Sequence, residues 1–320
     1  MSLITVVIPT FNRSSCIKLF LEKCLDGYKG NLFTFEIHDS SVDNITKDLI
    51  SEFQKKNKQV KINYFKYDSG INGDIKTINA LKKATTDFCF LLGDGVLVDF
   101  NAMERKLIEN NFDKYILISF CNDKIFKKYC DMNDDNYITD DLLEYCKHFF
   151  WNDTLYGSTI ISKKIIRNII DNNICNKYYD TTNFLYICSL FDSISLEKEK
   201  MLLCLSQKEI YSVNQFKVLS GWKRNGTTID VYCREYYLCV EKMYNSFDSI
   251  KKYLEHEPSL MFSFKGILGL RATGSITLKK IKKNWFYIKK VIRKPYRLYL
   301  SLIFPKCFLR LIRNIYKKGK

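Results

Sequence analysis

The chain has 320 residues, 46% of them hydrophobic and 27% charged, with a net charge of +16; this balance is typical of one large or two modest globular domains and excludes wholesale disorder. No apolar run reaches the roughly 18–20 residues that span a bilayer, and no basic region precedes an apolar stretch at the N-terminus, so we expect neither a transmembrane helix nor a signal peptide. The twelve cysteines include no Cys-x-x-Cys pair, which disfavours zinc ribbons and redox dithiols and predicts buried free thiols in a reducing cytosol.

The first hundred residues alternate between strand-like and helix-like segments. Runs of β-branched and aromatic residues predict strands over residues 3–9, 33–38, 60–67 and 87–92. Amphipathic stretches predict helices over residues 16–25, 44–56 and 72–84, the first of them capped by Ser14 or Ser15. This alternation predicts a doubly wound α/β sheet with helices on both faces. Later segments predict a strand over 114–120, a loop then a strand over 151–161, and helices over 184–191, 232–244 and 250–254.

Polar loops follow the predicted strands, at residues 10–13, 39–41, 70–74 and 93–95. Sheets of this class bind ligands at the carboxyl ends of their strands, so we expect these loops to converge on one crevice. There, Asp39 could accept hydrogen bonds from a base or a ribose, and Asp94, between two glycines, could hold a hard cation on a diphosphate. The ordinary alternatives are a helix cap for Asp39 and a Gly-Asp-Gly turn for Asp94. Neither G-x-G-x-x-G nor a P-loop motif occurs, which disfavours dinucleotide and P-loop nucleotide sites.

Four segments, taken in this order, resemble the family 2 glycosyltransferases of the GT-A fold. They are VVIPTFNR at 6–13, EIHDSSVD at 36–43, NGDIKTIN at 72–79 and ATTDFCFLLGDG at 84–95. The Leu-Leu-Gly-Asp form is closest to bacterial enzymes that decorate polysaccharides, including those resembling abequosyltransferases. The resemblance implies a mixed, Rossmann-like sheet and transfer of a sugar from a nucleotide-diphosphate donor.

The resemblance also implies roles for individual residues. Thr10, Asn12 and the backbone of Phe11 would line the nucleoside pocket, and Asp39 would recognise the base, most often uracil. Lys76 would lie near the donor. Asp94, followed by Gly95, would match the first carboxylate of the family's D-x-D motif, which binds Mg²⁺ or Mn²⁺.

One departure concerns the metal. Val96 stands where the family has the second carboxylate of D-x-D. Either Asp94 holds the cation with phosphate and water completing its shell, or cationic side chains replace the metal. Lys223 and Arg224 are our candidates for contacts with the diphosphate, and a solvated basic turn is the alternative.

Inverting transfer needs a carboxylate that deprotonates the acceptor hydroxyl. The family places this base at the start of a helix that follows the acceptor-binding strand. Asp180 precedes the predicted helix 184–191 and is our candidate, although it could also serve as the cap of that helix. Asp153 is the second choice, more plausibly as an acceptor contact.

The positive charge is concentrated in a segment that we call the basic tail, residues 275–320. It holds 15 Lys and Arg and no acidic residue, whereas the rest of the chain has 36 basic and 35 acidic groups. At helical spacing, Ile281, Trp285, Ile288 and Ile292 fall on one side. Basic amphipathic segments with aromatic residues suit an anionic membrane surface. The alternative is a helical cap that packs on the rest of the protein. Nucleic-acid binding is the least favoured role for this segment.

The resemblance, together with these observations, implies an inverting glycosyltransferase of the hexosyltransferase type. Its donor would be a nucleotide sugar, most often with UDP, and its acceptor a hydroxyl of a bacterial surface glycan or of its lipid-linked precursor. We expect a catalytic domain at 1–225 and a helical region at 226–320 that ends in the basic tail, peripheral at the cytoplasmic face of the membrane. The alternative is an inactive GT-A module that binds glycan or membrane.

Overall fold

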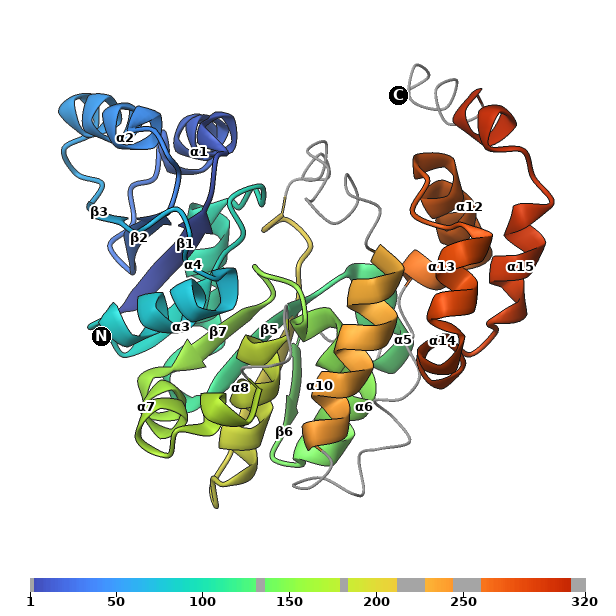
Figure 1. The fold of residues 1–320 in the computed structure, drawn as a ribbon. Coiled ribbons are helices and arrows are strands. Elements are labelled where there is room, and N and C mark those ends of the chain that lie inside the picture. The colour runs from blue at the N-terminus through green and yellow to red at the C-terminus, as the bar shows by residue number, and fades with distance from the viewer. Residues whose placement is uncertain (1–2, 131–135, 179–183, 212–227, 244–259, 312–320) are drawn as a thin grey trace. The chain divides into compact units, whose positions relative to one another are not determined.

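The computed structural model describes residues 3–130, 136–178, 184–211, 228–243 and 260–311 (Figure 1). The chain divides into two compact units. The first unit is Met1–Lys177 with Ser189–Lys217, and the second unit is Tyr178–Cys188 with Val218–Lys320. The boundary expected at 225/226 lies outside the described residues. No described helix has the length and hydropathy that a bilayer crossing requires.

One eight-stranded mixed sheet organises the first unit. Its strand order is β3-β2-β1-β4-β7-β5-β8-β6. The strands are β1 (Ile4–Thr10), β2 (Phe33–Asp39), β3 (Ile62–Lys66), β4 (Phe88–Leu91), β5 (Leu117–Cys121), β6 (Asn136–Thr139), β7 (Thr159–Ser162) and β8 (Leu202–Ser206). The first four strands pair in parallel, whereas β7 runs antiparallel to β4 and β5, and β6 runs antiparallel to β8. The predicted α/β sheet is therefore confirmed, with its four predicted N-terminal strands forming the parallel half.

Helices cover both faces of this sheet, as Figure 1 shows for α1 and α2 on one side of β1–β3 and α3 on the other. The helices are α1 (Ser14–Phe20), α2 (Ile45–Lys56), α3 (Gly73–Lys83), α4 (Phe100–Glu109), α5 (Asp123–Tyr129), α6 (Leu142–Asp153), α7 (Lys163–Asp171) and α8 (Leu185–Ser195), the last crossed by the division between the units. A π-helical turn, η1 (Leu21–Leu25), continues α1, and short 3₁₀ turns lie at η2 (Phe112–Lys114) and η3 (Ile174–Tyr178). Residues 151–153, expected as loop, are the last turn of α6.

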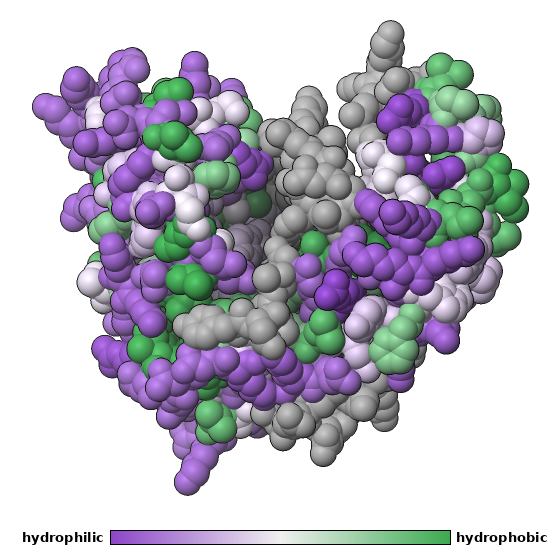
Figure 2. All heavy atoms as spheres, in the orientation of Figure 1, coloured by the Kyte–Doolittle hydropathy of each residue, from purple (hydrophilic) through white to green (hydrophobic). Residues whose placement is uncertain are grey.

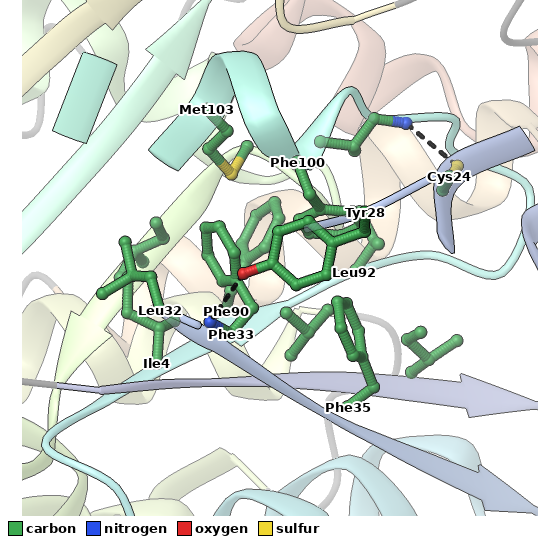
Figure 3. Close-up of a cluster of buried hydrophobic side chains, with 14 of the residues drawn as sticks. Ile4, Cys24, Tyr28, Leu32, Phe33, Phe35, Phe90, Leu92, Phe100 and Met103 are labelled. Carbon is green, nitrogen blue, oxygen red and sulfur yellow. Dashed lines mark hydrogen bonds between the residues drawn. The ribbon is translucent and has the colours of Figure 1, made fainter. Parts of the chain in front are cut away.

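The main core lies between the sheet and the face covered by α1, α2 and α4. Alternate strand residues point into it, because successive side chains of a strand face opposite sides of the sheet. Figure 3 shows this cluster, in which rings of Phe33 and Phe35 surround Phe100 at centroid distances of 5.0 Å. Tyr28 takes part as well: its hydroxyl donates to Oε2 of Glu104 at 2.8 Å, and the hydroxyl oxygen accepts from the Phe33 backbone N–H at 3.2 Å. The core thus fixes the strands whose ends carry the polar loops.

The second unit is helical in its described part. Its elements are η4 (Asp230–Glu235), α10 (Tyr236–Met243), η5 (Leu260–Phe262), α12 (Phe264–Thr273), α13 (Leu278–Lys283), α14 (Trp285–Val291) and α15 (Tyr296–Leu302). In the basic tail, Ile281, Ile288 and Ile292 are buried. Most of the apolar side predicted for this segment therefore packs within the protein, as the cap alternative expected. All twelve cysteines of the chain are free thiols, and ten of them are buried.

Candidate functional site

Three parallel strands end side by side and bring the first polar loops together. The sheet register places Thr10 opposite Asp39 and Asp39 opposite Lys66. Backbone bonds continue this pairing just beyond the strand ends, from Ser40 N–H to the Thr10 carbonyl at 3.2 Å and from Tyr67 N–H to the Asp39 carbonyl at 2.8 Å. Thr10, Asp39 and Lys66 therefore lie side by side at the carboxyl edge of the sheet, where ligands of such folds bind.

The Asp39 carboxylate is completely buried and is held by neighbours from the loop after β2 and from β3. Its Oδ1 accepts bonds from the Ser41 backbone N–H at 2.7 Å and from the Ser41 hydroxyl. Its Oδ2 accepts from the Tyr64 hydroxyl at 3.0 Å, and Lys66 Nζ lies 3.9 Å from the same oxygen. Burial, followed by the bond to Asp39, raises the pKa of Tyr64, so the hydroxyl stays a donor. Asp39 does not cap α2, whose N-cap is Asn44.

The Asp94 carboxylate lies in the tight turn after β4, where Val96 N–H donates to the Gly93 carbonyl at 2.9 Å. Its Oδ2 accepts from the Thr10 hydroxyl at 2.9 Å, and its Oδ1 lies 2.6 Å from Nη1 of Arg13. The side chain is buried, and burial raises its pKa, against the lowering effects of Arg13 and Thr10. Asp94 is thus joined to the β1 loop by one neutral and one charged partner.

Lys76, on the first turns of α3, is a buried ammonium group between the two carboxylates. Its Nζ donates to the Thr10 carbonyl and to the Ser40 hydroxyl, both at 2.7 Å. Burial lowers the pKa of Lys76 to about 8, and the charges of Asp39 and Asp94 oppose this effect. Because both carboxylates act on the same ammonium group, the structure brings them together at one edge of the sheet, as the order of the loops predicted.

The remaining predicted residues shape the loop after β1. Asn12 adopts a left-handed backbone conformation with φ of 51°, which asparagine tolerates well. Its N–H donates to the Ser41 hydroxyl at 2.8 Å and its Oδ1 accepts from the Val42 N–H at 3.2 Å, tying the two loops together. Phe11 is exposed. Gly95 leaves room for the guanidinium, because a Cβ there would lie 3.1 Å from Nη2 of Arg13.

Three residues of this cluster were not singled out by the sequence. Ser41 and Tyr64 hold Asp39, and Arg13 pairs with Asp94. Arg13 lies in a polar loop directly after a predicted strand, which could have marked it. Tyr64 could have been found only from the register of β2 against β3, which no local pattern contains.

Of the other predicted site residues, the structure describes Asp153 alone. Asp180, Lys223 and Arg224 lie outside the described residues. Asp153 is fully buried, and burial raises its pKa to about 7. Its Oδ2 accepts a bond from the Tyr145 hydroxyl at 2.7 Å, so Asp153 belongs to a buried polar pair and is not placed to touch an acceptor.

The donor set around Asp94 does not fit a divalent cation. Mg²⁺ and Mn²⁺ prefer several oxygen ligands, usually including more than one carboxylate. Oδ1 of Asp94 already pairs with the guanidinium of Arg13, whose positive charge would repel a second cation, and Val96 is buried in the main core. Within the described part of the chain, no group of three or more His, Cys, Asp or Glu could hold a metal ion.

No protein-family model matches the chain, and no curated protein matches it either. Solved structures do. S. aureus TarS 1-349 in complex with UDP-GlcNAc is 13% identical, with a TM-score of 0.56 over 99% of this chain and 92% of that one. The Pyrobaculum calidifontis mannosyltransferase PcManGT, in complex with GDP-Man and Mn²⁺, is 10% identical, with a TM-score of 0.50 over 99% and 88%. At such identities the likeness shows the fold, and the predicted GT-A fold is confirmed.

Proposed function

We propose that the chain is a glycosyltransferase that moves a sugar from a nucleoside diphosphate to a hydroxyl group. The acceptor would be a bacterial surface glycan or its lipid-linked precursor. UDP is our first choice of nucleotide, because S. aureus TarS 1-349 has been solved with UDP-GlcNAc and with UDP, and the Asp39 motif suits uracil. The narrower likeness to abequosyltransferases rests on the Leu-Leu-Gly-Asp sequence at 91–94 alone.

The observation that carries this proposal is the cluster of Thr10, Asp39, Lys76 and Asp94 at the carboxyl edge of the sheet. Two carboxylates and an ammonium group at such an edge can recognise a nucleoside and its phosphates. A carboxylate oxygen has two acceptor positions, so the Tyr64-bound oxygen of Asp39 keeps one for a base. Because Asp39 is completely buried, a base reaches this oxygen only when the surrounding loops shift on binding. We therefore propose that Asp39 contacts the base, and that Thr10, Phe11, Asn12 and Gly95 line the donor site.

We propose an inverting reaction with Asp180 as the base. The acceptor oxygen forms a bond to the anomeric carbon while the bond from that carbon to the diphosphate oxygen breaks. The acceptor proton passes to the carboxylate, and the nucleoside diphosphate leaves with the electron pair. This assignment rests on the sequence position of Asp180, before a helix that begins at Leu185. Lys223 and Arg224 remain candidates for contacts with the leaving diphosphate.

The buried Val96 favours a second candidate function, an inactive GT-A module that binds a nucleotide sugar without turning it over. In the first candidate, nucleotide is released from the donor and the release increases when a suitable acceptor is present. In the second, nucleotide binds but is never released from the sugar. The two are distinguished by measuring binding and release on the same preparation.

The deciding experiment measures nucleotide release by the purified full chain. UDP-sugars and GDP-sugars are supplied with and without glycan and lipid-linked acceptors, in EDTA and in Mn²⁺. We expect acceptor-stimulated release, and we expect Asp39→Asn to lower kcat/KM about tenfold or more, because a charged hydrogen bond contributes about 1.5–3 kcal/mol. The control is Asp171→Asn, an exposed carboxylate at the end of α7. If no donor binds or reacts, the proposal is wrong.

The same assay tests the base. Asp180→Asn is expected to lower kcat by about 100-fold or more, the usual contribution of a general base, while nucleotide binding stays unchanged. Full transferase activity in this variant would contradict the assignment.

We further propose that the second unit contacts an anionic membrane at its cytoplasmic face. The basic tail keeps many exposed apolar side chains in addition to the buried ones. Figure 2 shows hydrophobic residues gathered around the end of α15. The exposed apolar and aromatic residues of the whole basic tail are Leu278, Phe286, Tyr296, Tyr299, Leu300, Ile303, Phe308 and Leu311. Exposed apolar groups among lysines and arginines favour the interface of an anionic bilayer. A lipid-linked acceptor would be confined to that surface.

A further inference from the structure

The loop after β4 carries one carboxylate and one buried apolar residue where a metal-binding loop would carry two carboxylates. Val96 is 6% exposed and packs in the main core, so its position is directed away from any ligand. A change of Val96 to an acid would bury a charge there, which is costly unless it is paired. The second carboxylate is therefore absent from this position for a structural reason, and Asp94 stands alone.

A guanidinium group already pairs with the Asp94 carboxylate. Nη1 of Arg13 is 2.6 Å from Oδ1, and the Thr10 hydroxyl takes the other oxygen. Gly95 lets the guanidinium lie against the loop, since a Cβ there would meet Nη2 at 3.1 Å. The Arg13 side chain is one-third exposed, at 33%, whereas Asp94 is buried beneath it. One part of the guanidinium is thus fixed by the protein and another part faces outward.

This arrangement suits an anion with several oxygens. Arginine presents five N–H donors in a planar fork that matches phosphate geometry and remains charged at any physiological pH. The bond to Asp94 orients the fork without using all its donors. The neighbouring ammonium group of Lys76 adds a second positive charge behind the β1 loop, bonded to the Thr10 carbonyl.

We propose that Arg13, rather than a divalent cation, provides the positive charge that binds the donor's diphosphate beside Asp94. This inference rests on the proposed function and deepens it. It makes nucleotide binding independent of Mg²⁺ and Mn²⁺. Arg13 acts as a binding residue for the diphosphate, and Asp94 acts as the positioning residue that holds the guanidinium in place.

The test measures binding of UDP and GDP to the full chain by calorimetry, in EDTA and in Mn²⁺. Binding of at least one of them is expected to agree within about threefold between the two conditions. Arg13→Gln is expected to weaken that diphosphate by about tenfold or more, as loss of a charge-assisted hydrogen bond implies. Binding of the corresponding nucleoside, followed by NMR titration, should not change, because it lacks the phosphates. A purely structural role of Arg13 would weaken both ligands equally.

Two further variants sharpen the test. Lys18→Gln removes an exposed positive charge on α1, the helix that Arg13 precedes, and should leave both ligands unaffected. Arg13→Lys keeps the charge and should lose less affinity than Arg13→Gln; equal losses would contradict the role of the charge. Binding that disappears in EDTA and returns with Mn²⁺ overturns this inference alone. Absence of UDP and GDP binding in both conditions overturns the proposed function and the inference together.

Discussion

At the scale of single residues, the candidate site is held together by hydrogen bonds and charge pairs between residues that are far apart in the sequence. Thr10 illustrates this, because its hydroxyl donates to Asp94 while its carbonyl accepts from Lys76. Neither bond involves a neighbour in sequence. The residue types alone marked Asp39 and Asp94 as candidates, but the partners that orient them come from other strands and helices.

Lys76 makes the stability of the protein depend on pH. The folded state holds this group at a pKa of about 8, below its usual 10.5, because burial disfavours the charged form. Between these values the unfolded chain binds a proton that the folded chain does not, so this contribution to stability rises with pH from about 8 to about 10.5, by up to about 3 kcal/mol.

The measurement is the free energy of unfolding in urea, at intervals from pH 7 to pH 10, for the wild type and Lys76→Met. Other titrating groups cancel in the difference between the two proteins. We expect the wild type to gain stability relative to the variant as the pH rises above 8. A difference that stays constant with pH would show that Lys76 titrates normally.

At the scale of elements, the helix that carries Lys76 begins as its sequence predicted. Asn72 caps α3, and its Oδ1 accepts from the N–H groups of Asp74 at 2.8 Å and of Ile75 at 3.3 Å. The cap expected for α1 at Ser14 or Ser15 is wrong, because Arg13 occupies the N-cap position and its side chain pairs with Asp94 instead. A tertiary ion pair has replaced a local capping preference there.

Removal of the α3 cap is expected to destabilise the protein measurably. Asn72→Ala leaves two backbone N–H groups without their partner and should lower the free energy of unfolding by about 1 kcal/mol. Asn44→Ala is the matched control, because Asn44 is the N-cap of α2 but makes no side-chain capping bond. The two variants are compared by urea unfolding. Equal effects of both would contradict a specific role of the Asn72 cap.

At the scale of the whole molecule, the structure changes how the basic tail can be tested. Deletion of residues 275–320 would expose the buried partners of Ile281, Ile288 and Leu298 in the second unit. Substitutions at exposed positions avoid this difficulty. Ile303 and Phe308 suit the purpose, with 74% and 50% of their surface exposed.

The double variant Ile303→Ser with Phe308→Ser is expected to bind anionic vesicles about tenfold more weakly, or more weakly still. Each apolar group transferred to the interface contributes on the order of 1 kcal/mol. Flotation on vesicles of phosphatidylglycerol and phosphatidylcholine gives the measurement. Leu155→Ser with Leu196→Ser removes two exposed leucines from the first unit and is the control. Unchanged flotation of the tail variant would count against the membrane proposal.

The amino-acid sequence by itself determined the parallel half of the sheet, the order of the polar loops and the concentration of charge in the basic tail. These features depend on residues that are close together in the chain, such as the β-branched residues of β1 and the Asn72 cap. They can therefore be recognised without knowledge of the tertiary structure. The prediction from sequence missed β6, a strand of four residues, and β8, although β8 is an apolar run of the kind that predicted other strands. Only the tertiary structure decided that Arg13 lies on Asp94, that Tyr64 holds Asp39, and that Ile281, Ile288 and Ile292 are buried. Strand register and helix packing set these contacts between residues far apart in the chain, and no local pattern contains that information.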